Sequence, residues 1–312
     1  MDSPAPVILV SERGLLMDWL DKMNGAINYI EDHLTETIHL EDVAKKACMS
    51  VYYFQRMFSF ITDIPLSEYI RRRRLTLAAF ELQNTDVKVI DVSLKYGYNS
   101  PVSFARAFQS QHGIAPSLAR DKGVELKAYP RISFHITIKG DVAMDYKIVE
   151  KEAFTVYGIE EIFTMENDEN LIAIPKFWTT VFQDRRCEKL VSSGKNKETS
   201  GLCPINAVCD YRNTGGNTFP YMLFVLKNET SNTEGYTVVD IPAATWAIFK
   251  SREYTVEETS SVIQDLIKRV YTDWIPTANY EKIDGYELEM YYEKPETGKF
   301  YCETWIRVAP KG

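Results

Sequence analysis

The chain has 312 residues, of which 45% are hydrophobic, and this is enough to form the cores of two domains. Its formal net charge of −8 at pH 7 argues against a protein that binds nucleic acid along its whole length. The sequence has no apolar run that approaches a membrane span and no signal-peptide pattern, and its five scattered cysteines are typical of reduced thiols in a cytosolic protein.

The first segment, residues 1–16, contains two prolines and has mixed polarity, so we expect a disordered extension there. We expect Met17 to be the natural start and to open an all-α domain over residues 17–122. From Trp19 to Leu34, apolar residues at helical spacing predict the first helix of this domain.

Residues 38–65 predict a helix-turn-helix, in which a short helix from Leu40 is followed by a second helix. Ser50 lies where the cap of that second helix belongs. Its apolar stripe consists of Phe54, Met57, Phe58 and Ile61. The stripe leaves Tyr52, Gln55 and Arg56 on the outer face, where side chains can enter a major groove.

A long helix from Pro65 carries four consecutive arginines, residues 71–74. Such charge runs usually lie on a solvated helix face. The functional alternative is that the arginines contact DNA phosphates and form a salt bridge inside this helix, which connects the two helix-turn-helix units. Four consecutive residues point around the whole helix, so they cannot all face DNA. We therefore expect one or two of them to be structural.

Residues 86–116 repeat the helix-turn-helix pattern. Gly97 is suited to ending the first helix, and Ser100 with Pro101 is suited to starting the second. The second helix buries Phe104, Ala107, Phe108 and Gln111, which leaves Ser103 and Arg106 facing outward. An ordinary helical hairpin is the alternative, but the repetition favours DNA binding.

Near residues 121–127 the helical period gives way to alternation, which marks the start of a second domain over residues 123–312. A strand is expected at 132–140 and a helix at 173–190, and strand, helix, strand, strand recurs from Tyr236. We predict an α+β domain built from this duplicated unit, with two antiparallel sheets and a groove between the copies. Residues 24–122 carry a charge of +1 and residues 123–312 carry −7, so the acidic charge lies in the second half.

The last predicted strand places Tyr301, Glu303, Trp305 and Arg307 on one face. A glutamate between aromatic side chains needs a cation or hydrogen bonds to offset its burial. A ligand cation would fill this role, and an internal Glu303–Arg307 pair is the alternative. Further candidates for the walls of the groove are Glu289, Trp246, Trp178 and Tyr157.

The segments SVYYFQRMF, PLSEYIRRRRL and IDVSLKYGYNSPVSFARAFQSQHGIAP resemble the AraC/XylS family of bacterial transcription regulators over residues 24–120. The resemblance implies two helix-turn-helix units on separate major-groove segments. By position, Tyr52, Gln55 and Arg56 would read bases from the first unit, and Ser103 and Arg106 from the second. Arginine suits guanine and glutamine suits adenine.

The segments SFHITIKG, IPAATWAIFK and YELEMYY…CETWIRV resemble the GyrI-like effector-binding domain, which also follows the DNA-binding part in Rob-type members of the AraC family. This resemblance covers residues 126–309. It implies a groove for lipophilic, often cationic, small molecules, with Glu303 and Trp305 as its acidic and aromatic pair.

We therefore expect a cytoplasmic, ligand-responsive transcription regulator and not an enzyme. The expected partners are double-stranded DNA and a small-molecule effector, with RNA polymerase left open and no membrane, cofactor or metal expected. Two alternatives for the second domain are a hydrolase of reactive small molecules with Glu303 as general base, and a protein-binding module. The sequence leaves open the effector, the operator, activation or repression, and the oligomeric state.

Overall fold

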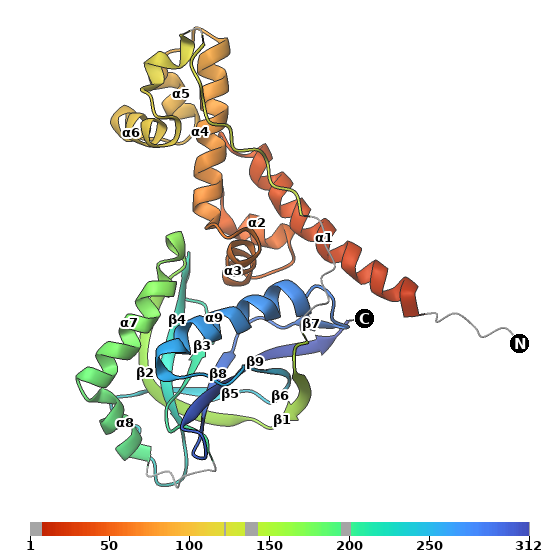
Figure 1. The fold of residues 1–312 in the computed structure, drawn as a ribbon, viewed down its shortest axis with the longest axis vertical. Coiled ribbons are helices and arrows are strands. Elements are labelled where there is room, and N and C mark those ends of the chain that lie inside the picture. The colour runs from red at the N-terminus through yellow and green to blue at the C-terminus, as the bar shows by residue number, and fades with distance from the viewer. Residues whose placement is uncertain (1–7, 122, 135–142, 195–200, 312) are drawn as a thin grey trace, which may run out of the picture.

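The computed structural model describes residues 8–121, 123–134, 143–194 and 201–311. The N-terminal part is helical, and α4 runs from the side of the C-terminal domain to the opposite end of the molecule, where α5 and α6 pack (Figure 1). The helices are α1 (Ile8–Asp32), α2 (Leu40–Lys46), α3 (Val51–Thr62), α4 (Leu66–Asn84), α5 (Val89–Lys95) and α6 (Pro101–His112), followed by the 3₁₀ helix η1 (Pro116–Arg120).

Helix α1 begins at Ile8, so the disorder expected for residues 1–16 is wrong from Ile8 onward. Residues 1–7 lie outside the described residues. Both prolines precede Ile8, and a single helical glycine such as Gly14 costs only about 1 kcal/mol.

The local signals at the two helix pairs are confirmed. Ser50 caps α3 by accepting a hydrogen bond from Tyr53 N at 3.2 Å, and Ser100 caps α6 by accepting from Val102 N at 3.3 Å. Gly97, with φ of +81°, stands in the turn between α5 and α6, where a left-handed conformation favours glycine.

All four arginines of residues 71–74 contact their own chain, more than the one or two expected. Arg71 and Arg72 bind Glu68 on the preceding turn at 2.7 and 2.5 Å. Arg73 forms a largely buried ion pair with Glu31 of α1 at 2.8 Å. Arg74 donates to the backbone carbonyls of Leu34 and Glu36, at 2.8 and 2.7 Å. Arg73 and Arg74 therefore fix α4 against α1 and the residues that follow α1, whereas Arg71 and Arg72 form pairs within α4.

The C-terminal part contains one antiparallel sheet in the order β1-β6-β9-β8-β3-β4-β2-β5, with β7 paired to β9. The strands are β1 (Tyr146–Lys151), β2 (Phe154–Thr164), β3 (Asn206–Cys209), β4 (Thr218–Leu226), β5 (Thr237–Ile241), β6 (Ala244–Lys250), β7 (Tyr280–Lys282), β8 (Glu287–Lys294) and β9 (Lys299–Pro310). The two separate sheets expected from the sequence are thus one continuous sheet.

Helices cover one face of this sheet (Figure 1). On the face that α7 and α8 cover, alternate residues of the strands are buried, such as Tyr221 and Leu223 of β4. The intervening Met222 and Phe224 join a second core on the opposite face. The covering elements are η2 (Glu166–Asp168), α7 (Asn170–Gln183), α8 (Arg186–Gly194), η3 (Val256–Glu258), α9 (Thr259–Arg269) and the π-helical turn η4 (Val270–Trp274).

Two predicted strands differ from the structure. Residues 132–134 form no strand, and the rest of the strand expected at 132–140 lies outside the described residues. The single strand expected from residue 237 is divided into β5 and β6, which pair with different neighbours. Pro242 stands between them and has no N–H group to continue a ladder.

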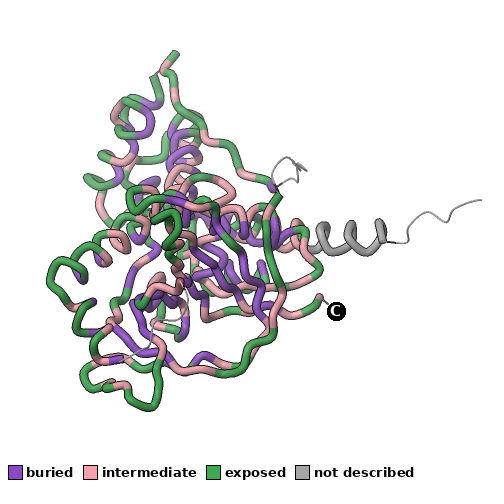
Figure 2. Tube along the Cα trace, turned by 60° about the horizontal axis from the view of Figure 1, so that its bottom comes forward, coloured by how far each residue is buried: buried purple, intermediate pink, exposed green. Residues whose placement is uncertain are grey.

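The helical part and the sheet share a hydrophobic core. Phe54 and Met57 of α3 belong to the same buried cluster as Ile263 of α9 and Tyr271 of η4. Figure 2 shows buried positions along the central elements, with exposed positions on the outer helices and loops. The helix expected to enter DNA from the first pair is therefore part of the junction between the two halves.

Candidate ligand cavity and DNA interface

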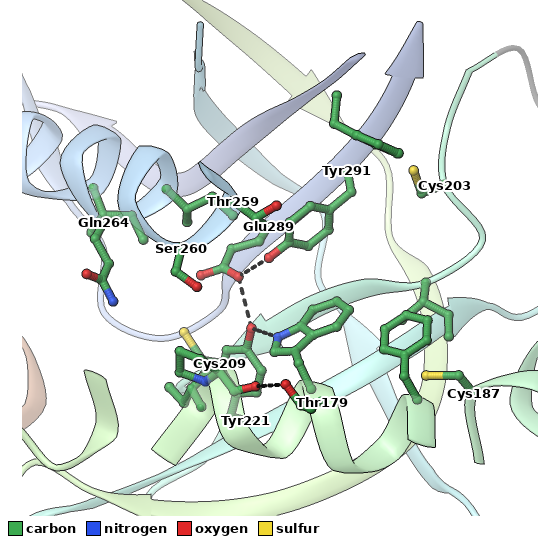
Figure 3. Close-up of a pocket in the computed structure, with 18 of the residues that line it drawn as sticks. Thr179, Cys187, Cys203, Cys209, Tyr221, Thr259, Ser260, Gln264, Glu289 and Tyr291 are labelled. Atoms are coloured by element: carbon green, nitrogen blue, oxygen red, sulfur yellow. Dashed lines mark hydrogen bonds between the residues drawn. The ribbon is translucent and has the colours of Figure 1, made fainter. Parts of the chain in front are cut away.

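A cavity of about 1140 Å³ lies between α7, α8, α9 and the sheet, and α3 closes part of it. Figure 3 shows its polar centre, where Glu289 faces Tyr221 and Tyr291. Much of the wall is apolar or aromatic, which is typical of small-molecule sites. The aromatic residues that line it are Tyr52, Phe60, Trp178, Phe182, Phe219, Tyr221, Tyr254, Tyr291 and Phe300.

Glu289 of β8 is half-buried in this cavity and accepts hydrogen bonds on Oε2 from Tyr221 Oη at 2.9 Å and Tyr291 Oη at 2.7 Å. Tyr221 is itself held by Trp178 Nε1 at 2.9 Å. Burial raises the pKa of Glu289, and the hydrogen bonds from Tyr291 and Tyr221 offset only part of that rise. A cation beside this carboxylate would stabilise its charged form.

Glu303, expected to supply this charge, lies on the other face of the sheet. In the β8–β9 register Glu289 is opposite Thr304, whereas Glu303 is opposite Met290, whose side chain belongs to the core away from the helices. Glu303 pairs with Lys147 Nζ at 2.9 Å. Glu303 does not line the cavity, so the predictions that it binds the ligand or acts as a general base there are both wrong.

The alternative Glu303–Arg307 pair is also wrong, because Arg307 donates to the backbone carbonyl of Asp284 at 3.3 Å. Trp305 donates to Glu303 at 3.0 Å and packs on Trp246, 6.1 Å away between ring centroids. Both tryptophans belong to the core on the face away from the helices, so neither lines the cavity.

Tyr157 also belongs to a core, where it lies fully buried with its hydroxyl 3.0 Å from Ser193 Oγ. Of the six residues expected at the ligand site, Glu289 and Trp178 line the cavity. Sequence reasoning missed Tyr221 and Tyr291. The period-two alternation of β8 carried a signal for Tyr291, which shares a face with Glu289.

The residues expected to read DNA from the second helix pair are exposed. Ser103 and Arg106 lie on the open side of α6, while Phe104 and Phe108 are fully buried beneath them. Val102 on the same side is 60% exposed. This face of α6 is open to a partner.

The residues expected to read DNA from the first helix pair are not exposed. Tyr52 is 8% exposed and Gln55 is 7% exposed, and the side chain of Arg56 is 11% exposed. The expectation of an open outer face is therefore wrong for this arrangement. Its physical reason is a second apolar surface on α3, where Tyr52 packs 4.8 Å from Phe219 between ring centroids.

Arg56 ends in a buried charge cluster of the C-terminal domain. Its Nη1 lies 2.6 Å from Glu287 Oε2, and Lys282 Nζ lies 3.2 Å from Glu287 Oε1. Tyr271 donates a further hydrogen bond to Glu287. Burial by itself raises the pKa of Glu287, but the charges of Arg56 and Lys282 outweigh it, so the pKa lies below its ordinary value.

The described part of the chain contains no group of three His, Cys, Asp or Glu side chains that could hold a metal ion. None of its helices is both long enough and apolar enough to cross a bilayer. All five cysteines lie within this part, and each is free.

Comparisons with known proteins match both halves of the chain. A family described as the GyrI-like small molecule binding domain matches residues 144–309, and a helix-turn-helix domain family matches residues 43–122. The chain is 47% identical over 92 residues to the HTH-type transcriptional activator AarP of Providencia stuartii. These residues cover 30% of this chain and 68% of AarP.

Two further relatives are the regulatory protein SoxS of Escherichia coli K12 and the transcriptional regulator Rob of Salmonella typhimurium. SoxS is 41% identical over 91 residues, which cover 29% of this chain and 85% of SoxS. Rob is 24% identical over 288 residues, which cover 90% of this chain and 93% of Rob. The chain thus belongs to the AraC family of DNA-binding transcriptional regulators and senses a ligand through a C-terminal GyrI-like domain.

Proposed function

We propose that residues 17–122 bind DNA and that residues 123–312 sense a lipophilic cation in the cavity around Glu289. The observation that carries the ligand class is a carboxylate held at the centre of an aromatic cavity. Within the described residues no lysine or arginine forms an ion pair with Glu289, so its charge is balanced only by hydrogen bonds and by the more distant Arg56 until a ligand binds.

The walls of the cavity favour a cation with apolar substituents. The rings of Trp178 and Tyr291, whose centroids lie 5.3 Å apart, line the cavity together with Glu289. Contact between a cation and the face of an aromatic ring contributes about 0.5–2 kcal/mol. Apolar substituents add about 25 cal/mol for each Å² removed from water. A lipophilic cation gains from both terms, and a neutral molecule gains mainly from the second.

On the DNA side, we infer that α2–α3 and α5–α6 act as two helix-turn-helix units. Exposed Arg106 and Ser103 support base contacts by α6, since arginine can bind guanine through two hydrogen bonds. Tyr52, Gln55 and Arg56 are proposed as the corresponding residues of α3. They reach DNA only in an arrangement that exposes α3.

We further propose that the C-terminal domain arose by duplication of one unit. Exchanging β1 with β5, β2 with β6, β3 with β8 and β4 with β9 turns the strand order into its own reverse. This internal two-fold relation supports the proposal, and the cavity lies between the helices of the two units.

As a transcription regulator the protein would act in the cytoplasm, with RNA polymerase as a further partner to test.

Isothermal titration calorimetry on the full chain tests the ligand class. The probes are the (biphenyl-4-yl)methyl trimethylammonium cation and its neutral analogue with carbon in place of nitrogen. In Glu289→Gln the preference for the cation should be lost, while the neutral analogue binds as before. Glu303→Gln removes the same charge from the opposite face and should keep the preference. Equal preference in the wild type and Glu289→Gln would refute the proposal.

A further inference from the structure

We propose that the C-terminal domain masks helix α3 from DNA, and that a cation bound at Glu289 releases this helix. Masking follows from the contacts of α3 alone. Release by a cation rests on the proposed function, because it requires the cavity to bind that class of ligand.

The outer face of α3 is covered along its length by the C-terminal domain. At its start, Ser50 Oγ donates to Asp284 Oδ1 at 3.2 Å, and further along Ser59 Oγ donates to Asp168 Oδ2 at 2.7 Å. At its end, Asp63 pairs with Lys268 of α9. A helix cannot occupy a major groove while this face is buried, because the same side chains would have to contact the bases.

The ion pair of Arg56 with Glu287 is far more buried than the pair of Asp63 with Lys268. The side chains of Arg56 and Glu287 are 11% and 4% exposed, so their ion pair is shielded from solvent. The guanidinium also lies over the rings of Tyr52 and Tyr271, at 5.5 and 5.1 Å from their centroids. Removing one partner from a buried pair leaves the other charge uncompensated, which strongly destabilises the arrangement that buries it.

The same arginine borders the ligand cavity. Tyr52, Arg56 and Phe60 of α3 all line it, so α3 forms part of the wall. Glu287 and Glu289 point to the same face of β8, about 7 Å apart along the strand. Arg56 therefore forms an ion pair with Glu287 and is attracted at longer range by Glu289. The charge of Arg56 in turn favours the ionised form of Glu289.

A cation at Glu289 weakens this hold in two ways. It neutralises the second carboxylate that attracts Arg56, and it places a like charge near the guanidinium in a poorly solvated site. A neutral molecule of the same shape does neither. The expected direction is therefore release of α3, and hence tighter DNA binding, when a cation is bound.

The mask is tested without any ligand, by gel-shift titration and hydroxyl-radical footprinting. The DNA is a duplex selected from random sequence by the full-length Glu287→Gln chain. Glu287→Gln should bind it roughly 5- to 150-fold tighter than the wild type, the usual range for coupled sites. It should protect two major-groove segments, whereas the wild type protects one. The control Glu303→Gln makes the same charge change and should behave as the wild type. Equal behaviour of the two variants would overturn the mask.

A second variant keeps the test valid if Glu287→Gln fails to fold, which its melting temperature reveals. Lys268→Glu turns the exposed pair with Asp63 into a repulsion and should also tighten DNA binding. It adds negative charge, so unspecific electrostatics alone would weaken binding. Weaker binding by Lys268→Glu would therefore count against the mask.

The trimethylammonium probe tests release. It should tighten DNA binding by the wild type toward the Glu287→Gln value, and the neutral analogue should leave binding unchanged. If calorimetry detects the cation bound while DNA affinity stays constant or falls, release is wrong. If calorimetry detects no binding, the proposed ligand class is wrong, and the mask is still decided by the substitutions.

Discussion

Two adjacent tyrosines of β8 allow a sharp test of the Glu289 site. Tyr291 donates to Glu289 at 2.7 Å inside the cavity, and Tyr292 donates to Glu303 at 3.2 Å on the opposite face. Replacement by phenylalanine removes one hydroxyl in each case and keeps the ring. A hydrogen bond to a charged group is worth about 1.5–3 kcal/mol, and its loss in Tyr291→Phe should raise the pKa of Glu289 further.

The protonation state of Glu289 determines how cation affinity depends on pH. Only the ionised carboxylate attracts a cation, and therefore cation affinity is lost as the pH falls through the pKa of Glu289. A higher pKa in Tyr291→Phe moves this loss to higher pH. At a pH below the pKa of Glu289 in both proteins, the cation should bind Tyr291→Phe roughly 10- to 150-fold more weakly than the wild type, as expected for about 1.5–3 kcal/mol.

The assay is calorimetric titration of the trimethylammonium probe and its neutral analogue from pH 5 to pH 9. Tyr292→Phe should keep the wild-type pH profile, and the neutral analogue should show none in either variant. An unshifted midpoint in Tyr291→Phe, or an equal shift in Tyr292→Phe, would refute the role given to Glu289.

Two further predictions concern DNA reading and the sheet. Arg106→Ala should weaken binding to selected DNA by about 1–3 kcal/mol and relax preference at one base pair, measured by gel shift on single-base variants; unchanged affinity would remove Arg106 from the interface. Gly158→Ala should lower the free energy of unfolding by about 3 kcal/mol in urea, because its Cβ would lie 1.8 Å from Leu223 O. A Cβ built on Gly25 of α1 would meet no atom within 4 Å, so the control Gly25→Ala should raise the free energy of unfolding by about 0.5–1 kcal/mol. Equal stability of the two variants would contradict the packing argument.

Local signals in the sequence were sufficient for the two helix pairs, α2–α3 and α5–α6, and for their caps. Ser50, Gly97 and Ser100 act through neighbours a few residues away, so residue type and spacing predict their roles. The same holds for exposed Arg106, which lies opposite the buried stripe of α6.

Long-range pairing decided the rest. Alternation along β8 and β9 groups residues by face, but the register and the placing of the helices determine that Glu289, not Glu303, meets the cavity. In α3 the sequence displays one apolar stripe clearly. The second surface around Tyr52 becomes apparent only when Phe219 and Glu287 are brought to it from more than 160 residues away.

Cation binding at Glu289 and DNA binding by α3 should be coupled, because α3 forms part of the cavity wall. Coupling between two binding sites must be reciprocal. The most direct measurement is the affinity of the wild-type chain for the trimethylammonium probe, by calorimetry, with and without saturating selected DNA. DNA should tighten cation binding by the same factor by which the cation tightens DNA binding, and this factor should approach one in Glu287→Gln. If DNA leaves the cation affinity of the wild type unchanged, the two sites are not coupled.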